Sequence, residues 1–337
     1  MSEKNYLHPF LKYPGGKTKE IPLVLKYMPV GSKRYIEPFV GGGSIYFALD
    51  IHPSFINDKS EDLYEIYSYI KAQNKKFYKY LKGMDDLWAL VEDANFLVKV
   101  KNVSFVDFER FKNYYNKSLS RKEKSIEKFE ADGITVSEED KIATELTARK
   151  TAVYMIVRDI YNAHQKNKEL HVACFYFLRE YCYSSMFRFS AKGDFNVPYG
   201  GMSYNSKRMT SKIEYMFSDE MKNYMQDTTI GNEDFASFLD SCRLNEDDFV
   251  FLDPPYDSDF STYDNNPFDK NEQIRLRDYL KSIKAKWMLI IKKTDFISDL
   301  YKDFYVFEYD MNYMVSFKNR NDRDVEHLLI TNYKLEE

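Results

Sequence analysis

The chain has 337 residues, which is enough for one large hydrophobic core or two smaller ones. Its hydrophobic content of 44% and its 29 Tyr and 26 Phe exclude an intrinsically disordered protein. No apolar stretch reaches membrane-spanning length, and the three Cys and five His show no metal-binding spacing. We therefore expect a folded, cytoplasmic protein without a metal site.

The net charge of −4, taken over the whole chain, does not indicate a nucleic-acid-binding protein. Basic residues are nevertheless concentrated in two stretches, at 112–128 and 179–212. A locally positive surface is sufficient for phosphate contacts. For the first stretch, a solvated helix face is the simpler interpretation.

The first sixty residues alternate helix and strand patterns. A helix is predicted at 18–28, a strand at 34–38, a small apolar helix at 44–50 and a second strand at 54–58. Three consecutive glycines, Gly41 to Gly43, separate the first strand from its helix. This order is typical of the βαβ unit that binds nucleotides.

Residues 61–215 are predicted to form an inserted, mainly helical lobe. Apolar residues recur there at helical spacing, and a break is expected at 132–135. Ser137, followed by three acidic residues, is a helix N-cap signal. An aromatic, glycine-containing stretch at 181–201 ends the lobe.

The strand pattern resumes after the lobe. A strand is predicted at 249–252, a helix at 272–283, a strand at 287–291, and a strand pair at 304–309 and 325–333 around the polar loop 318–323. This alternation predicts an α/β fold whose mostly parallel sheet carries an antiparallel edge strand. The predicted domains are a core at 1–60 and 216–337 and the inserted lobe at 61–215.

The tetrapeptide Asp253-Pro254-Pro255-Tyr256 directly follows the predicted strand at 249–252. Because proline lacks an N–H and has a fixed φ, the chain must turn sharply here. The Asp253 carboxylate and the Pro254 carbonyl can each accept one N–H of a planar aromatic amine, on which Tyr256 can stack. These groups suit alkylation of an exocyclic amine such as that of adenine. An ordinary strand-ending turn is the alternative.

Two glycine loops can approach a ligand closely. The loop at 13–18 ends like a phosphate-binding loop, but Leu11 stands where such a loop has its first glycine. The loop at 37–43 has Gly-x-Gly without a third glycine, and Asp58 ends the next strand, where a carboxylate can bond ribose hydroxyls. We expect a nucleoside ligand with a small charged tail, such as S-adenosylmethionine, and a plain βαβ turn remains the alternative.

Five segments in this order complete a family pattern. They are Tyr13–Lys17, Glu37–Gly43, Asn57-Asp58, Asp194–Gly200 and Asp253–Tyr256. Over residues 10–333 the chain resembles the Dam-like DNA adenine-N6 methyltransferases. The resemblance implies a Rossmann-like, S-adenosylmethionine-dependent methyltransferase core that carries an inserted target-recognition lobe with a β-hairpin. It also implies site-specific methyl transfer to N6 of an adenine flipped out of double-stranded DNA.

The resemblance assigns roles to matching positions. Catalysis falls to the tetrapeptide, Asp253, Pro254, Pro255 and Tyr256. The cofactor S-adenosyl-L-methionine would be held by Tyr13, Gly15, Gly16, Lys17, Glu37, Phe39, Gly41, Gly43, Asp58, Asp234, Phe235 and Asp253. DNA would be bound by Lys12, Tyr183, Ser184, Met186, Arg188, Lys192, Asn196 and Pro198. Of these, Tyr183 is expected to fill or wedge the base stack and Arg188 to bond a base edge.

The chain also departs from the family pattern. Members that recognise GATC carry Asn-Gly where this chain has Ser184-Ser185, and Arg where it has Gly201. Loss of a base-contacting arginine changes or relaxes what is recognised, so GATC is not assigned as the site. The helical segment 92–146 is long for the family. The two roles open to it are added DNA contacts and a surface for a partner.

Three other functions are open at this point. Methylation of cytosine N4 is the nearest, because cytosine carries a similar amine. A DNA-binding homologue without activity is the second, although the intact tetrapeptide disfavours it. Methylation of RNA or of a protein amide is the third, and the 181–201 stretch disfavours it. The sequence also leaves open whether a restriction endonuclease acting on the same site is a partner.

Overall fold

The computed structural model describes residues 7–13, 15–164, 166–186, 188–255, 268–311 and 325–335. They form two compact units. Described residues of the first unit fall within Met1–Pro9, Gly15–Ser68 and Asn223–Glu337, and those of the second within Phe10–Pro14 and Tyr69–Lys222. The sequence placed the lobe at 61–215, whereas the second unit begins later, ends later and includes residues from the segment before the first glycine loop.

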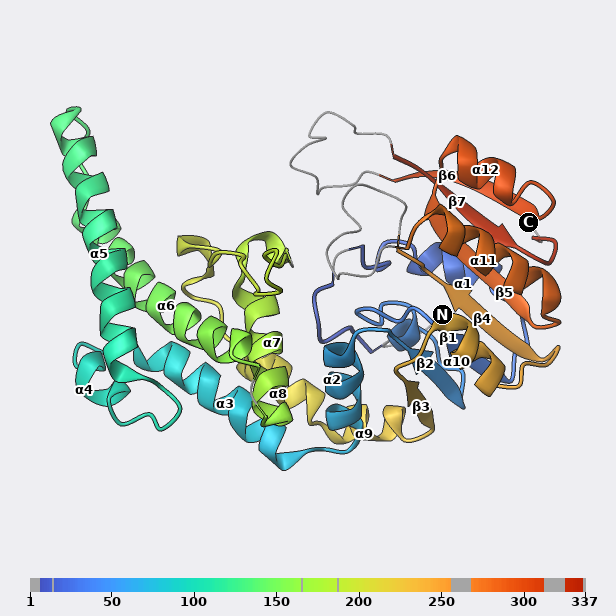
Figure 1. Cartoon of the computed structure of the whole chain (residues 1–337), viewed down its shortest axis with the longest axis horizontal. Coiled ribbons are helices and arrows are strands. Elements are labelled where there is room, and N and C mark those ends of the chain that lie inside the picture. The colour runs from blue at the N-terminus through green and yellow to red at the C-terminus, as the bar shows by residue number, and fades with distance from the viewer. Residues whose placement is uncertain are drawn as a thin grey trace, which may run out of the picture. The chain divides into compact units, whose positions relative to one another are not determined.

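A seven-stranded sheet forms the centre of the first unit, with strand order β3-β2-β1-β4-β5-β7-β6 (Figure 1). The strands are β1 Arg34–Glu37, β2 Ser54–Asn57, β3 Thr228–Gly231, β4 Asp248–Leu252, β5 Lys286–Lys292, β6 Tyr305–Met311 and β7 Val325–Thr331. The five neighbouring strands β3, β2, β1, β4 and β5 all pair in parallel. Strand β7 runs antiparallel to both β5 and β6. The predicted α/β fold with a mostly parallel sheet and an antiparallel edge is therefore confirmed. The reversed strand, β7, lies one place in from the edge.

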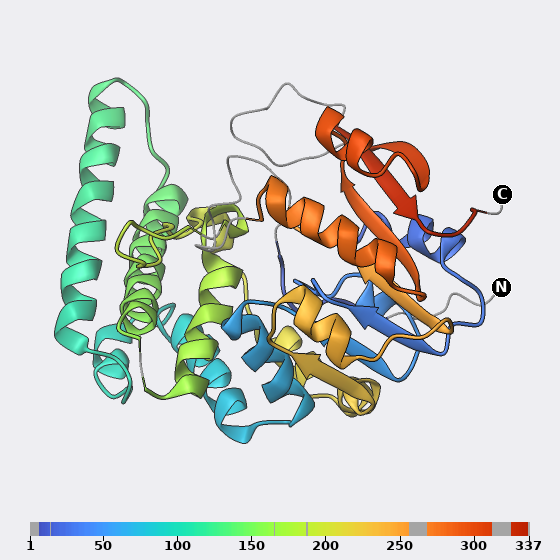
Figure 2. The ribbon, with the colours of Figure 1, turned by 45° about the vertical axis from the view of Figure 1, so that its right-hand side comes forward.

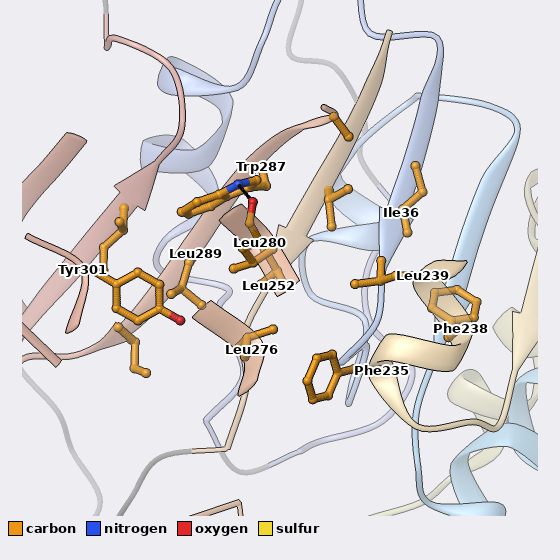
Figure 3. Packing of buried hydrophobic residues seen from close by; sticks show 14 of the residues in the cluster. Ile36, Phe235, Phe238, Leu239, Leu252, Leu276, Leu280, Trp287, Leu289 and Tyr301 are labelled. Atoms are coloured by element: carbon orange, nitrogen blue, oxygen red, sulfur yellow. Dashed lines mark hydrogen bonds between the residues drawn. The ribbon is translucent and has the colours of Figure 1, made fainter. Parts of the chain in front are cut away.

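The helices of the first unit shield this sheet from water. They are α1 Ile21–Tyr27, α10 Phe235–Ser241, α11 Lys270–Ser282 and α12 Asp295–Leu300, and α2 Glu61–Lys71 and α9 Asp219–Met225 contain the unit boundaries. Figure 2 shows α10 and α11 on one face of the sheet. Their apolar side chains pack on Ile36, Leu252 and Trp287, and the Trp287 indole N–H donates to the Leu280 carbonyl at 3.2 Å (Figure 3). All five residues of β4 are buried, as expected for a strand covered on both faces.

Two predictions for this unit need correction. The small apolar helix expected at 44–50 is only a 3₁₀ turn, Tyr46–Ala48, because Leu49 already has extended backbone angles. Strand β3 was not predicted. It lies at the edge of the sheet and only its first residue, Thr228, is buried, so it lacks the apolar run that marks a buried strand, and it forms by pairing with β2. The loop predicted at 318–323 lies outside the described residues.

The second unit is mainly helical, as predicted. Its elements are α3 Lys75–Leu90, α4 Phe96–Val100, α5 Phe108–Ala131, α6 Glu138–Asn162, α7 Lys168–Tyr181, α8 Thr210–Met216 and the 3₁₀ turns Tyr183–Ser185 and Met202–Tyr204. The break at 132–135 separates α5 from α6, and the Ser137 hydroxyl caps α6 by accepting from the Asp140 N–H at 3.1 Å. In the part of the chain that the structure describes, no helix has the length and apolarity needed to cross a membrane.

The stretch at 181–201 contains less regular pairing than the predicted β-hairpin. It makes two isolated antiparallel bridges, Cys182 with Tyr199 and Phe189 with Phe195. The Tyr183 N–H also donates to the Pro198 carbonyl at 2.9 Å. The two arms of this segment thus run side by side without a continuous ladder in its described residues.

A buried carboxylate ties α3 to the start of α8. Asp85 has no exposed surface and accepts from two Arg208 nitrogens at 3.1 and 2.8 Å, from the Met209 N–H at 2.8 Å and from the Thr210 hydroxyl at 2.6 Å. Burial alone would raise the pKa of Asp85, but these hydrogen bonds lower it below its usual value. Asp85 is therefore held as an anion that joins the two helices.

Substitution Asp85→Ala is expected to lower the free energy of unfolding by about 3 kcal/mol, because several buried donors lose their acceptor. Urea unfolding followed by circular dichroism measures this change. The control is Asp86→Ala, which removes an exposed carboxylate bonded to Lys82 and should cost less than about 1 kcal/mol. Equal losses in the two variants would contradict the role given to Asp85.

Candidate active site

The candidate site lies where β1, β2 and β4 end. These strands are neighbours and run in parallel, so their carboxyl ends share one edge of the sheet. Beyond β1 the chain continues into the Gly41–Gly43 loop, beyond β2 into Asp58 and beyond β4 into Asp253. In doubly wound sheets this edge, at the point where strand order reverses, is where ligands bind. The fold therefore brings Gly41, Gly43, Asp58 and Asp253, four of the predicted positions, to one edge.

A buried ion pair connects the first glycine loop to the catalytic corner. The Lys17 ammonium lies 2.7 Å from Asp253 Oδ1 and 2.8 Å from Oδ2, and it also donates to the Gly15 carbonyl at 2.8 Å. The Lys17 side chain is 3% exposed and that of Asp253 is 21% exposed. Burial raises the pKa of Asp253, and the nearby ammonium opposes this rise without cancelling it. Each carboxylate oxygen keeps a lone pair for another donor.

A buried glutamine that was not predicted as a site residue stabilises the turn at Asp253–Pro255. Gln273, fully buried on α11, donates through Nε2 to the Pro255 carbonyl at 3.1 Å. A signal was available, because Gln273 occupies the same helix face as the buried Leu276 and Leu280, where an apolar residue is expected. Pro254 is buried and Pro255 is exposed. Tyr256 lies outside the described residues.

Asn57, which the family pattern includes but to which no role was assigned from the sequence, joins three loops at this edge. Its Nδ2 donates to the carbonyls of Pro38 and Glu233 at 3.0 Å each, and its Oδ1 accepts from the Glu233 N–H at 2.9 Å. These contacts tie the chain after β1 to the chain after β3. A Cβ at Gly231 would stand 2.7 Å from Asn57 Oδ1, so glycine is required there.

The glycine loop after β1 is held by Asp58 and Tyr67. The Gly41 N–H donates to Asp58 Oδ2 at 3.0 Å, and the Tyr67 hydroxyl donates to the Gly41 carbonyl at 3.0 Å. Gly43 has φ +75°, and a Cβ there would lie 2.6 Å from the Tyr67 hydroxyl. Only glycine satisfies both conditions.

Glu37, predicted as a cofactor residue, is buried at the end of β1. It accepts from the Tyr35 hydroxyl at 2.7 Å. Burial raises its pKa well above the usual value, the Tyr35 hydrogen bond opposes the rise, and the nearby Asp253 and Asp58 add to it. Three acidic side chains therefore interact at the carboxyl edge of the sheet.

Phe39, Asp234 and Phe235 form the far side of this edge. The Phe39 ring lies 5.7 Å from the Phe235 ring. Asp234 caps α10 by accepting from the Ala236 N–H at 3.1 Å, and Arg275 binds both of its oxygens at 2.8 and 2.5 Å. The Arg275 hydrogen bond lowers the pKa of Asp234 below its usual value. The Asp234 side chain thus already fixes α10 and α11.

The predicted DNA-binding residues all belong to the second unit. The 181–201 segment carries Tyr183, Ser184, Met186, Arg188, Lys192, Asn196 and Pro198. Tyr183 is 38% exposed, and the exposed Arg188 donates through Nε to Asn196 Oδ1 at 2.8 Å.

The remaining two predicted residues of this unit, Lys12 and Tyr13, pack against Arg179. The Arg179 guanidinium lies 4.7 Å from the centre of the Tyr13 ring, and its Nη2 donates to the Lys12 carbonyl at 3.3 Å. The Lys12 side chain is exposed. Tyr13 is thus held within the second unit, whereas Gly15, Gly16 and Lys17 belong to the first.

Two consecutive serines beside Tyr183 have left-handed backbone conformations. Ser184 has φ 53° and Ser185 has φ 52°, a region that residues other than glycine rarely occupy. Such strain persists only where surrounding structure imposes it, and it is concentrated at functional segments. Gly201, with φ +87°, ends the same segment and needs its glycine for the same reason.

Together these features define an α/β protein whose mostly parallel sheet brings Lys17, Asp58 and Asp253 to its carboxyl edge, the place where ligands bind in doubly wound sheets. Comparison with known proteins gives the family. The model of the D12 class N6 adenine-specific DNA methyltransferases matches residues 13–315, and the chain belongs to that family. It is thus an enzyme, an adenine-specific DNA methyltransferase, as the motifs predicted, and its family implies S-adenosylmethionine as methyl donor.

Relatives match over nearly the whole chain. The type II methyltransferase M.CviBI of Paramecium bursaria Chlorella virus NC1A is 27% identical over 335 residues, covering 97% of this chain and all of the relative. The type II methyltransferase M.MjaIII of Methanocaldococcus jannaschii is 27% identical over 346 residues, covering 96% and 99%. The DNA adenine methylase of Escherichia coli K12 is 22% identical over 287 residues, covering 84% and 78%.

Glu37→Gln should change how stability depends on pH. A carboxyl whose pKa is raised in the folded state contributes stability below its unfolded pKa, and that contribution is lost as pH rises toward the folded pKa. The variant should therefore gain in free energy of unfolding relative to the parent protein as pH rises from 5 to 8, by up to about 1.4 kcal/mol per pH unit. Urea unfolding at several pH values tests this, and parallel curves for the two proteins would contradict it.

Ser185→Gly should stabilise the protein by about 1 kcal/mol, because glycine adopts positive φ without strain. Thermal unfolding measures the effect. Ser120→Gly on the exposed surface of α5 is the matched control, since the same change in an unstrained helix should destabilise by a similar amount. Destabilisation by both substitutions would show that the turn is not strained.

Proposed function

We propose that this enzyme transfers methyl from S-adenosylmethionine to N6 of an adenine flipped out of double-stranded DNA, at a specific site. The first unit would be the Rossmann-like catalytic core and the second the target-recognition lobe. The observation that carries the proposal is the position of Asp253, which ends β4 at the strand-order reversal and is bound by Lys17 from the glycine turn. The setting we assign is cytoplasmic.

The carboxyl edge suits the cofactor chemically. S-adenosylmethionine carries a sulfonium and an ammonium, and it supplies a methyl group activated for transfer. Burial raises the pKa of Glu37, and the nearby Asp253 and Asp58 add to the rise, so a cationic ligand beside these side chains favours their charged forms. This observation supports the fit of the residues to the group.

The binding roles follow from this arrangement. Asp58 accepts from two backbone N–H groups, of Gly41 at 3.0 Å and Ser60 at 2.9 Å, which fixes its carboxylate for ribose hydroxyls. Gly41 and Gly43 let the backbone pass close to the methionine end, and Phe39 offers an apolar ring. Asp234 and Phe235, at the far side, would lie along the adenine. Tyr13, Gly15 and Gly16 keep their assignment to the cofactor from the sequence.

The Asp253 corner would orient the amine. The carboxylate of Asp253 and the carbonyl of Pro254 each accept one amine N–H, and the nitrogen lone pair is left directed at the methyl. Alignment and electrostatic support of the charge that builds on nitrogen would supply most of the catalysis. Asp253, whose pKa burial raises, would then take the proton that the alkylated nitrogen releases. The stacking role of Tyr256 is proposed from its sequence position.

The second unit would recognise the DNA sequence and separate the target base from its partner. A base in a duplex is out of reach of an active site, so it must be flipped out. The exposed Tyr183 would fill the space left in the stack, and Arg188, oriented by Asn196, would bond a base edge. Because Gly201 replaces an arginine, we assign no recognition sequence. The type II names of M.CviBI and M.MjaIII support a restriction endonuclease acting on the same site.

Asp253→Asn tests the proposal. Asparagine keeps an oxygen for Lys17 but presents an NH₂ to the amine, so methylation should fall by about 100-fold or more while the protein stays folded. Alanine is a poorer choice, because it would leave the buried Lys17 ammonium unpaired at a cost of about 3 kcal/mol. The assay is methyl transfer to duplex DNA, with mass spectrometry of the digested product.

The matched control is Asp247→Asn, an exposed carboxylate paired with Lys33 next to β4, which should retain turnover. Turnover of the Asp253→Asn variant within tenfold of the parent enzyme would refute the catalytic role of Asp253. Detection of N4-methylcytosine in place of N6-methyladenine would refute the choice of target base.

A further inference from the structure

Helix α5 carries a stripe of cations that the active site does not explain. Lys117, Arg121, Lys124 and Lys128 follow one another at spacings of four, three and four residues, so they share one face of the helix. All four side chains are exposed. The helix lies beside α6 (Figure 1). Its buried residues, Phe111 and Tyr115, are on a different face from the four cations.

Among the described residues, the cations of the stripe form no ion pair, unlike Arg110 and Lys112 on the same helix. Arg110 lies within 4 Å of carboxylates of Asp107 and Asp159, and Lys112 is bonded to Glu109 at 2.9 Å. Over the ranges that the structure describes, none of the four stripe cations forms an ion pair with a carboxylate. This face of α5 therefore presents four cations without an ion pair to any described residue, beside Glu123, Glu127 and Glu130 on the same half of the helix, on a chain whose net charge is −4.

This arrangement destabilises the helix that bears it. Like charges three or four residues apart repel, by a few tenths of a kcal/mol per pair, whereas alternating charges stabilise a helix. The helix dipole favours a cation in the last turn, which accounts for Lys128 but not for the other three. The neighbouring helix α6 instead pairs Arg149 with Glu145 across one turn.

The stripe has dimensions that suit a polyanion. From residue 117 to residue 128 a helix rises about 16 Å. Duplex DNA carries one phosphate charge per roughly 1.7 Å of its axis, so several phosphates fall within that length. Figures 1 and 2 show α5 and the segment after α7 rising on the same side of α3 within the second unit.

We propose that the stripe Lys117-Arg121-Lys124-Lys128 binds phosphates of the DNA duplex, independently of base sequence. This inference rests on the proposed function, because it takes duplex DNA as the substrate. It gives the long α5–α6 hairpin a role in holding DNA while the 181–201 segment selects the site. An acidic protein partner is the competing occupant, and it predicts no change in DNA binding.

The test is the salt dependence of binding to a 36-base-pair duplex of mixed sequence, measured by fluorescence anisotropy. The variant is Lys117→Gln/Arg121→Gln/Lys124→Gln/Lys128→Gln, in which glutamine preserves helix propensity. Loss of four phosphate contacts should reduce the slope of log K against log salt by about 3.6. The ratio of the parent's binding constant to that of the glutamine variant should accordingly fall about 100-fold between 50 and 200 mM salt.

Two further variants separate position from charge. Lys75→Gln/Lys79→Gln/Lys284→Gln/Lys286→Gln removes the same charge from exposed lysines elsewhere, and it should keep the parent slope. Lys117→Arg/Lys124→Arg/Lys128→Arg keeps the stripe charged, and it should bind as the parent does. Circular dichroism confirms that each variant is helical.

The stripe has no DNA role if the glutamine variant keeps the parent slope, or if the control variant loses as much slope. Either result overturns the inference even when the parent enzyme methylates the duplex normally. Failure of the proposed function is a separate observation, since the parent enzyme would then methylate no adenine.

Discussion

The ion pair between Lys17 and Asp253 is the interaction on which the candidate site depends. It joins residues 236 positions apart and fixes both the turn at Gly15 and the corner at the end of β4. A buried ammonium without its acid costs several kcal/mol, so neither partner can leave without penalty. The carboxylate is therefore oriented before any substrate arrives, and this preorganisation is what catalysis by alignment requires.

The same constraint shapes the rest of the carboxyl edge. An acid placed beside Asp253 must be neutralised or hydrogen-bonded. Glu37 meets this condition by a raised pKa and a bond from Tyr35, and Asp58 by two backbone N–H groups. The second unit uses buried pairs in the same way, since Glu180 is held between Lys207 and Lys212 at 2.7 Å each. Its unpaired stripe on α5 stands in contrast, because those cations face outward.

Part of this architecture was predictable because its causes are local. Two prolines force the turn after Asp253, Ser137 caps α6 through a bond to Asp140, and the 132–135 break follows from its glycine. The expected helix at 44–50 is only a 3₁₀ turn because the chain is already extended at Leu49. Strand β3 was missed because only its first residue is buried and it lacks an apolar run; it forms by pairing with β2 at the edge of the sheet.

The sequence by itself determined the α/β class, the order of the motifs and the family, since each depends on residue types at short spacing. Only the tertiary structure decided which motifs meet. It placed Asp253 against Lys17, Gln273 behind Pro255 and Asn57 between the loops after β1 and β3. It also showed which α5 cations lack partners. The physical reason is that a pattern at short spacing predicts which face of a helix or strand is buried, whereas contacts between residues far apart in the chain depend on tertiary packing.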